Sequence, residues 1–131
     1  MADFMKPYGS HTYALMRIMV GLLFLCHGLS KLFGFPTPPP AGAPPFVVYG
    51  AGSIELVCGA LVALGLLTRW AAFIASGEMA VAYWLGHGTR ALLPIQNQGE
   101  LAVLYCFVFL FISSHGPGIW SVDTANTSGG R

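Results

Sequence analysis

Four apolar runs, each close to the length of a membrane-crossing helix, occupy most of this sequence. They cover residues 13–33, 46–67, 70–86 and 98–114. A helix that crosses the hydrocarbon core of a bilayer needs about 20 mostly apolar residues. Because 55% of the residues are hydrophobic and only 8% are charged, against about 25% charged in soluble domains, the sequence predicts an all-α integral membrane protein.

The links between the runs suggest how the helices are arranged. The first link, residues 34–45, is rich in proline, which has no backbone donor and stops a helix. The second, Thr68-Arg69, is so short that it predicts antiparallel neighbours. We therefore expect one four-helix transmembrane bundle over residues 1–123 and a disordered tail over 124–131.

An even number of spans places both termini on the same side of the membrane. Lys6, Arg17, Arg69 and Arg131 lie at the terminal side, and Lys31 and Arg90 at the other. Since cytoplasmic loops carry the excess of lysine and arginine, we expect cytoplasmic termini in a multi-pass protein of the bacterial inner, or plasma, membrane.

Charge and cysteine spacing exclude several functions. The net charge is +1 and no cluster of lysine or arginine is present, so nucleic acid is not an expected partner. Cys26, Cys58 and Cys106 stand singly in three runs, without the C-x-x-C spacing of zinc or thioredoxin sites. We interpret them as small buried hydrophobes and expect no metal site.

The ionisable residues are the more informative group, because most of them lie within or beside the apolar runs. A charge at the bilayer centre costs about 2.5–3.5 kcal/mol on insertion scales, so such residues normally face a protein interior. They share helix faces with small residues, which allow another helix to approach closely. The three faces contain, in chain order, Arg17, Gly21, Phe24, Gly28 and Lys31; Gly52, Glu55, Gly59 and Ala63; and Ala71, Ala75, Glu78 and Ala82.

Two interpretations of these charges compete. Glu55 or Glu78 could pair with Arg17 or Lys31 and only hold the helices in register. That pairing would not account for His27, which lies one helical turn before Lys31. Since His87 and Glu100 are also left over and unpaired buried groups are costly, the surplus favours a ligand, water or proton path.

Several motifs together resemble the DoxX family of small four-helix membrane proteins. They are "RIMVGLLFLCHGLSKLFGF", "ELVCGALVALGLLTR" and "GPGIWSVD", in order between residues 16 and 123. The resemblance implies a membrane subunit engaged in redox work, since the family is named for its likeness to the DoxD subunit of thiosulfate:quinone oxidoreductase. The proline-rich first link is particular to this chain.

This resemblance and the polar residues lead to a first hypothesis, a membrane subunit of a quinone-linked sulfur or thiol oxidoreductase system. His27, Lys31 and Glu55 would be its catalytic groups, because quinone reduction needs hydrogen-bond donors and a proton supply. Quinone would be a substrate or bound ligand, and no haem, flavin or metal motif is present. The residues assigned to substrate or quinone binding are Glu78, His87, Arg90 and Glu100.

Two other classes remain open. The chain could be a non-catalytic anchor for a soluble redox enzyme, held through the Arg69 turn or residues 116–123. It could instead be a small proton-coupled carrier in which Glu55 and Glu78 titrate. The expected partners are the lipid bilayer and either a redox subunit or further copies of the chain, and the sequence leaves open whether the protein is itself an enzyme.

Overall fold

The computed structural model describes residues 3–128, which contain helices and turns and no strand. This confirms the all-α class. The longer helices are α1 (Gly9–Phe33), α2 (Gly52–Leu64), α3 (Thr68–Gly86) and α5 (Glu100–His115). The shorter elements are η1 (Lys6–Tyr8), η2 (Phe46–Ala51), a wide π-helical turn that leads into α2, α4 (Pro94–Asn97) and α6 (Val122–Ser128).

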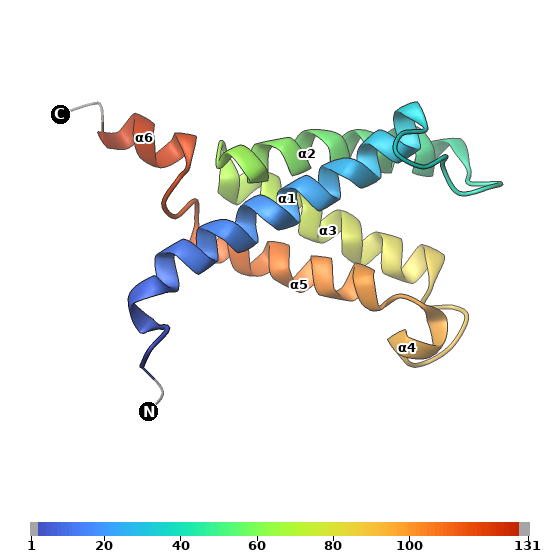
Figure 1. Ribbon diagram of the computed structural model, residues 1–131. Helices are drawn as coiled ribbons and strands as arrows, with labels where there is room; N and C mark the ends of the chain where they lie inside the picture. Colours follow the sequence, from blue (N-terminus) through green and yellow to red (C-terminus); the bar gives the residue numbers. More distant parts are fainter. Residues whose placement is uncertain (1–2, 129–131) are drawn as a thin grey trace.

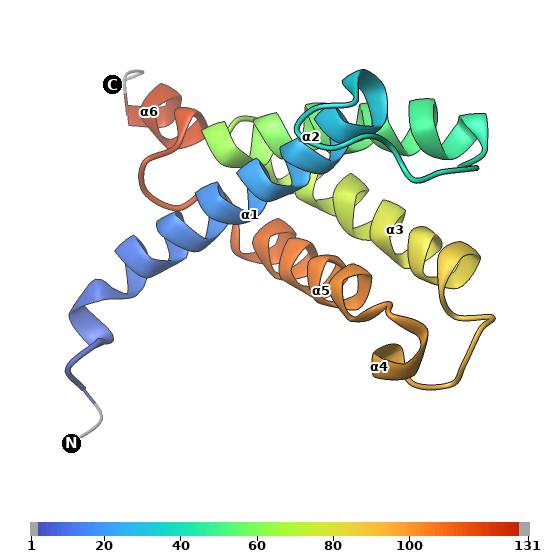
Figure 2. The ribbon, with the colours of Figure 1, turned by 45° about the vertical axis from the view of Figure 1, so that its right-hand side comes forward.

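The longer helices pack as two pairs (Figures 1 and 2). Helix α1 lies along α2, α3 lies along α5, and α2 contacts α3. The start of α1 and helix α6 lie at one end of the molecule, whereas α4 and the link over residues 34–45 lie at the opposite end. We call this second end the loop end.

Glycines let α1 and α2 approach closely. A Cβ built on Gly21 would stand 2.5 Å from the backbone nitrogen of Ala63, and one on Gly59 would stand 2.5 Å from that of Leu25. Gly28 meets the backbone of α2 at Leu56 and Gly52 in the same way. Small residues at such positions are how helices associate in lipid, where burying apolar surface provides no advantage over contact with lipid tails.

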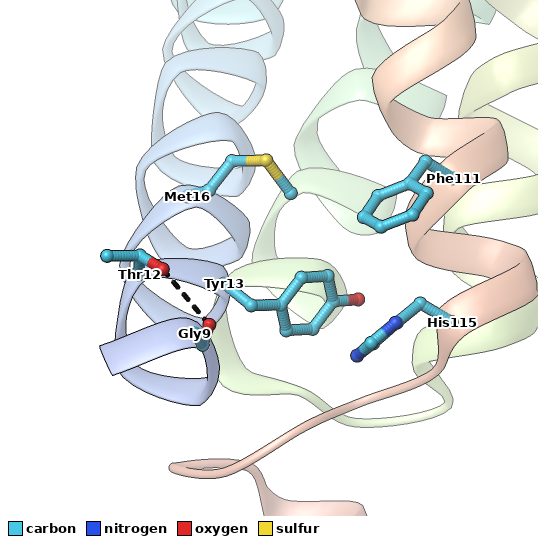
Figure 3. Close-up of a pocket in the computed structure, with 6 residues that line it drawn as sticks. All are labelled: Gly9, Thr12, Tyr13, Met16, Phe111 and His115. Atoms are coloured by element: carbon cyan, nitrogen blue, oxygen red, sulfur yellow. Dashed lines mark hydrogen bonds between the residues drawn. The ribbon is translucent and has the colours of Figure 1, made fainter. Parts of the chain in front are cut away.

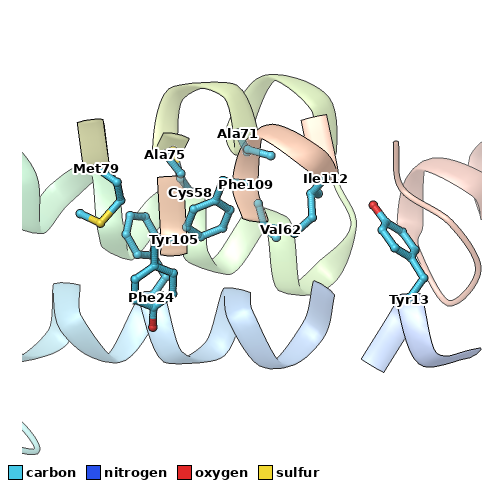
Figure 4. Packing of buried hydrophobic residues seen from close by; sticks show 11 residues of the cluster. Tyr13, Phe24, Cys58, Val62, Ala71, Ala75, Met79, Tyr105, Phe109 and Ile112 are labelled. Carbon is cyan, nitrogen blue, oxygen red and sulfur yellow. The ribbon is translucent and has the colours of Figure 1, made fainter. Parts of the chain in front are cut away.

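Aromatic side chains fill the space between the two pairs (Figure 4). Phe24 of α1 is fully buried, and its ring centroid lies 4.7 Å from that of Phe109 and 5.5 Å from that of Tyr105, both on α5. Within the second pair, the Ser76 hydroxyl of α3 donates to the Cys106 carbonyl of α5 at 2.8 Å. The core therefore joins α1 to α5 through side chains.

Large apolar side chains cover the outside of the helices. Examples on α1, α3 and α5 are Leu22, Phe73 and Phe107, which are all exposed. The segments Lys6–Phe33 and Phe46–Leu64 are long and apolar enough to cross a membrane, with mean hydropathy values of 1.6 and 1.9, and Glu100–His115 is a shorter apolar helix. An apolar exterior is expected of a protein that is surrounded by lipid.

The link between α2 and α3 differs from the expected Thr68-Arg69 turn. Helix α2 ends at Leu64 and α3 begins at Thr68, so the turn is Gly65–Leu67. Gly65 has φ of +69°, a conformation that favours glycine, and Leu66 N donates to Leu61 O at 2.9 Å. This is the hydrogen bonding of a helix that terminates on glycine.

The expected disordered tail is wrong for residues 124–128, which belong to α6. The physical reason is local capping, because Ser121 Oγ accepts a hydrogen bond from Thr124 N at 3.3 Å. The side chains of Thr127 and Ser128 also donate to the Thr124 carbonyl. Residues 129–131 of that tail lie outside the described residues.

Candidate functional site

Lys31 and Glu55 form an ion pair between α1 and α2 near the loop end. Glu55 is only 2% exposed and Lys31 only 16%. Glycine favours this arrangement, because a Cβ built on Gly52, one turn before Glu55, would stand only 3.0 Å from Lys31 Cβ. Of the pairings that the sequence allowed, Lys31 with Glu55 is the one that forms.

The carboxylate oxygens at this site are incompletely satisfied. Glu55 Oε2 and Glu78 Oε2 are buried and have no hydrogen-bond partner in the described chain. Glu78, on α3, lies within electrostatic range of both Glu55 and Lys31. At about 1.5 Å per helical residue, the two carboxyl groups stand on the order of 12 Å inside the loop end. Buried unpartnered polar atoms of this kind are rare in native proteins and call for an explanation such as a ligand, a water or a proton.

His27 and Tyr105 complete the group. His27, on α1, is exposed and lies within electrostatic range of Glu55. Its ring centroid is 6.0 Å from that of Tyr105 on α5, and the two rings are perpendicular. Tyr105 is 7% exposed and stacks on Phe109. The site thus combines a buried charged interior with a histidine at the outer surface of α1.

The other predicted site residues lie elsewhere. His87 Nδ1 is 3.0 Å from the Asn97 carbonyl, in a loop where Asn97 Nδ2 also donates to Tyr83 Oη at 3.0 Å. Arg90 and Glu100 are exposed and have no side-chain hydrogen bond or ion pair in the described chain. The structure therefore brings together His27, Lys31, Glu55 and Glu78, but not His87, Arg90 or Glu100.

The cysteines do not form a thiol pair. All three are free; Cys26 is exposed, Cys58 is buried, and Cys106 is half-buried with its Sγ 3.6 Å from Ser76 Oγ. Across residues 3–128, no three His, Cys, Asp or Glu side chains lie close enough to hold a metal ion.

Arg17 has a different role from that of Lys31, because it contacts carbonyl groups instead of a carboxylate. Fully buried, it donates from Nη1 to Val62 O and Ala63 O at 2.7 and 2.8 Å, and from Nη2 to Ile119 O and Trp120 O at 3.3 and 2.8 Å. The carbonyls of the last turn of a helix have no partner within the helix. Arg17 therefore joins the C-terminal end of α2 to the segment that follows α5.

Asp123 and Arg69 cap two further helix ends at this side of the molecule. Asp123 accepts hydrogen bonds from Leu67 N at 2.9 Å, Thr68 N at 3.0 Å and Thr68 Oγ1 at 2.8 Å, and so caps the N-terminus of α3. Arg69 donates to the carbonyls of Ser113 and Ser114 at 2.9 and 2.6 Å, at the end of α5. We call this side the capped end.

The pKa of Asp123 reflects this capping. Partial desolvation acts to raise the pKa of the carboxyl group. The hydrogen bonds from Thr68 and Leu67, with the nearby Arg17 charge, outweigh desolvation, and the pKa is lowered from its ordinary value. The positive end of the α3 dipole favours a carboxylate in the same place.

A surface groove lies beside the capped end, and few polar atoms line it (Figure 3). It has a volume of about 480 Å³ and is almost wholly apolar. Tyr13 donates from its hydroxyl to Gly116 O at 2.6 Å, and its ring centroid lies 4.0 Å from that of His115. Since the unpartnered carboxyl groups are at the loop end, we place the candidate site there and not in the groove. The groove is lined by Gly9, Thr12, Tyr13, Met16, Phe111 and His115.

Sequence reasoning missed Tyr105 and Asp123. Tyr105 had one available signal, since it lies four residues before Phe109 and so shares its helix face. Asp123 belongs to the "GPGIWSVD" motif, but no local pattern indicates that its partners are 55 and 56 residues away.

Comparison with known proteins places these features in a family. A Haemophilus influenzae protein named only as uncharacterized is 39% identical over 126 residues, covering 91% of this chain and 93% of its own length. An uncharacterized membrane protein of Mycobacterium tuberculosis is 36% identical, covering 82% of this chain and 77% of its own. A Bacillus subtilis protein named "Putative oxidoreductase CatD" is 41% identical over 59 residues, or 42% of this chain and 44% of its own.

No solved structure matches the chain. The DoxX family model matches residues 12–88, which include most of α1, all of α2 and α3, and every grouped site residue except Tyr105. With the apolar exterior and the related membrane protein, this match is decisive: the chain belongs to the DoxX family of membrane proteins.

Proposed function

We propose that α1, α2, α3 and α5 cross the bacterial inner membrane as an antiparallel four-helix bundle with cytoplasmic termini. The support is the apolar exterior of these helices and the position of α6 and the start of α1 at the same end. Lys6 and Arg69 belong to that end, in keeping with the positive-inside rule. The loop end then faces outward.

We propose further that the protein is the membrane subunit of a quinone-linked sulfur or thiol oxidoreductase system. The observation that carries this proposal is the buried Lys31–Glu55 pair, with unpartnered carboxyl oxygens on Glu55 and Glu78, beside the exposed His27. Charged residues within the membrane are costly and commonly mark substrate pathways or proton relays.

A quinone suits this site chemically. Its head group is flat, carries two carbonyl acceptors and moves within the lipid, where it could meet His27 from the side of the bundle. His27 and the Tyr105 hydroxyl can donate hydrogen bonds to such acceptors. Lys31, Glu55 and Glu78 would supply protons from the interior of the bundle.

The reaction balances with thiols as the reductant. Oxidation of two thiols to a disulfide releases two electrons and two protons, and reduction of a quinone to a quinol takes up both. The "oxidoreductase" in the name of the B. subtilis relative is consistent with such chemistry. A partner subunit would deliver the electrons if the thiols belong to another protein.

The test is quinone binding and turnover in liposomes. The purified protein is reconstituted with a ubiquinone or menaquinone analogue, and thiol-dependent or thiosulfate-dependent quinol formation is followed optically. Loss of an acid–base group typically reduces rates by about 10²–10⁴-fold. We therefore expect His27→Ala and Lys31→Met to reduce turnover at least 100-fold.

The matched control is Glu100→Gln, which removes an exposed charge at the start of α5. It should turn over like the wild type. A stably folded protein that neither binds quinone nor forms quinol contradicts the proposal. Such a result would favour the alternative that the chain is a non-catalytic anchor for a soluble redox enzyme. Proton flux without quinone would instead favour a proton-coupled carrier.

A further inference from the structure

Charges at the loop end do not balance if every group is ionised. The interior there contains one lysine, Lys31, and two carboxyl groups, Glu55 and Glu78. Lys31 contacts Glu55, so its charge is already compensated. Two ionised carboxylates would leave one uncompensated negative charge inside the apolar part of the molecule.

No neighbouring element compensates that charge. Facing Glu78 from α1 is Lys31, and facing it from α2 are Glu55 and the Cys58 thiol. Beyond these, His27 of α1 and Tyr105 of α5 lie within electrostatic range of Glu55. Within residues 3–128, Glu78 makes no side-chain hydrogen bond and no ion pair.

An isolated carboxylate in a low-dielectric interior is so costly that a group in this position normally neutralises instead. A proton is the smallest ligand that removes the charge, and the buried, unpartnered Oε2 of Glu78 is an acceptor for it. Glu55 is the less suitable carrier, because its charge compensates the adjacent ammonium group.

We propose that Glu78 binds one exchangeable proton in the resting protein, so that Lys31, Glu55 and Glu78 are together electrically neutral. This deepens the proposed function, because it names the residue that supplies a proton to the quinone. It rests on that function only for the use of the proton, since its presence requires no quinone.

Infrared spectroscopy of the protein in liposomes, without quinone, tests this directly. A protonated carboxyl group has its own carbonyl stretching band, which shifts on transfer to D₂O. The chain has only five Asp and Glu residues, so the assignment is tractable. At neutral pH we expect one such group in the wild type and none in Glu78→Gln.

Charge balance predicts the infrared spectra of two further variants. Glu100→Gln, the exposed control, should retain the single band. Lys31→Met should show two, because Glu55 then loses its counter-ion and takes up a proton. The proposal is overturned if the band persists in Glu78→Gln or if its intensity does not rise in Lys31→Met.

The outcome is separable from that of the turnover assay. A single band that depends on Glu78, in a protein that does not reduce quinone, would retain the proton site and reject the quinone role. Quinone reduction by a wild-type protein that lacks the band would retain the quinone role and reject the proton site on Glu78.

Discussion

Arginine at the capped end and glutamate at the loop end are both buried, but they differ in how fully their polar atoms are satisfied. Arg17 donates to four carbonyl groups, and only its Nε lacks a partner. Glu55 and Glu78 each retain an unpartnered oxygen in the described chain. A satisfied buried charge holds helices together, whereas an unsatisfied one is available to a proton or ligand. Four sets of substitutions test this difference and the helix packing that underlies it.

The largest expected effect is at Arg17. Arg17 donates to four carbonyl groups, and a buried acceptor left without its donor costs about 1–3 kcal/mol. Since several acceptors lose their donor together, we expect Arg17→Ala to lose more than about 3 kcal/mol of stability, measured as a lower midpoint of thermal unfolding in detergent. Arg90→Ala, at an exposed site, is the control and should unfold like the wild type. An unchanged midpoint for Arg17→Ala would mean that the hydrogen bonds of Arg17 at the capped end do not stabilise the fold.

The ion pair at the loop end should behave as a coupled unit. Contacting charged residues show interaction energies of about 0.5–3 kcal/mol in double-mutant cycles. We expect Lys31→Met and Glu55→Gln each to destabilise, and the double variant to be more stable than the sum of the two predicts. Unfolding midpoints of all four proteins give the coupling directly. Strict additivity would mean that the two side chains do not interact.

Close helix packing should matter at Gly28 and not at Gly77. Because a Cβ at Gly28 would overlap the α2 backbone, Gly28→Ala should cost about 1–3 kcal/mol, as overpacking does. Gly77 has open space around its Cα, so Gly77→Ala should be neutral or slightly stabilising. If both variants unfold alike, the close contact between α1 and α2 is not a source of stability.

The smallest effect is expected at Asp123, which is partly exposed. Loss of a helix N-cap costs about 0.5–2 kcal/mol, and we expect Asp123→Ala to fall in the lower half of that range. Since the pKa of Asp123 is lowered on folding, its contribution is present above the ordinary aspartate pKa of about 3.9. It is lost as the pH falls through the lower, folded value.

A pH series of unfolding midpoints checks this sign. The wild type and Asp123→Ala should differ at neutral pH and converge at strongly acidic pH. A difference that grows on acidification would mean that the carboxylate does not act as the cap.

The sequence predicted the helices better than it predicted their ends. The shared face of Gly21, Gly28 and Lys31 follows from helical periodicity, and the structure uses it against α2. The end of α2 was misplaced, because continued hydrophobicity from 61 to 67 conceals the stop at Gly65. That stop uses the left-handed backbone conformation of Gly65, and the Gly65 carbonyl accepts a hydrogen bond at 2.9 Å from Asp123 N, far along the chain.

The candidate site was predictable only in part, for a similar reason. Lys31 and Glu55 were visible as charges on small-residue faces. By contrast, His87 was predicted to bind substrate or quinone, but its Nδ1 lies 3.0 Å from the Asn97 carbonyl in the loop between α3 and α5. Periodicity reports the face of a helix, and it does not report which loop atoms will satisfy a residue at the helix end.

The capping by Asp123 and Arg17 also determines when the molecule can be completed. Arg17 lies in the first long helix, yet two of its four carbonyl partners, Ile119 and Trp120, come 102 and 103 residues later in the chain, after α5. The N-terminus of α3 is likewise capped only after Asp123 has been synthesised. Helices α1, α2 and α3 can therefore form early in synthesis, but their final arrangement is completed only after α5 and the segment that follows it have been made.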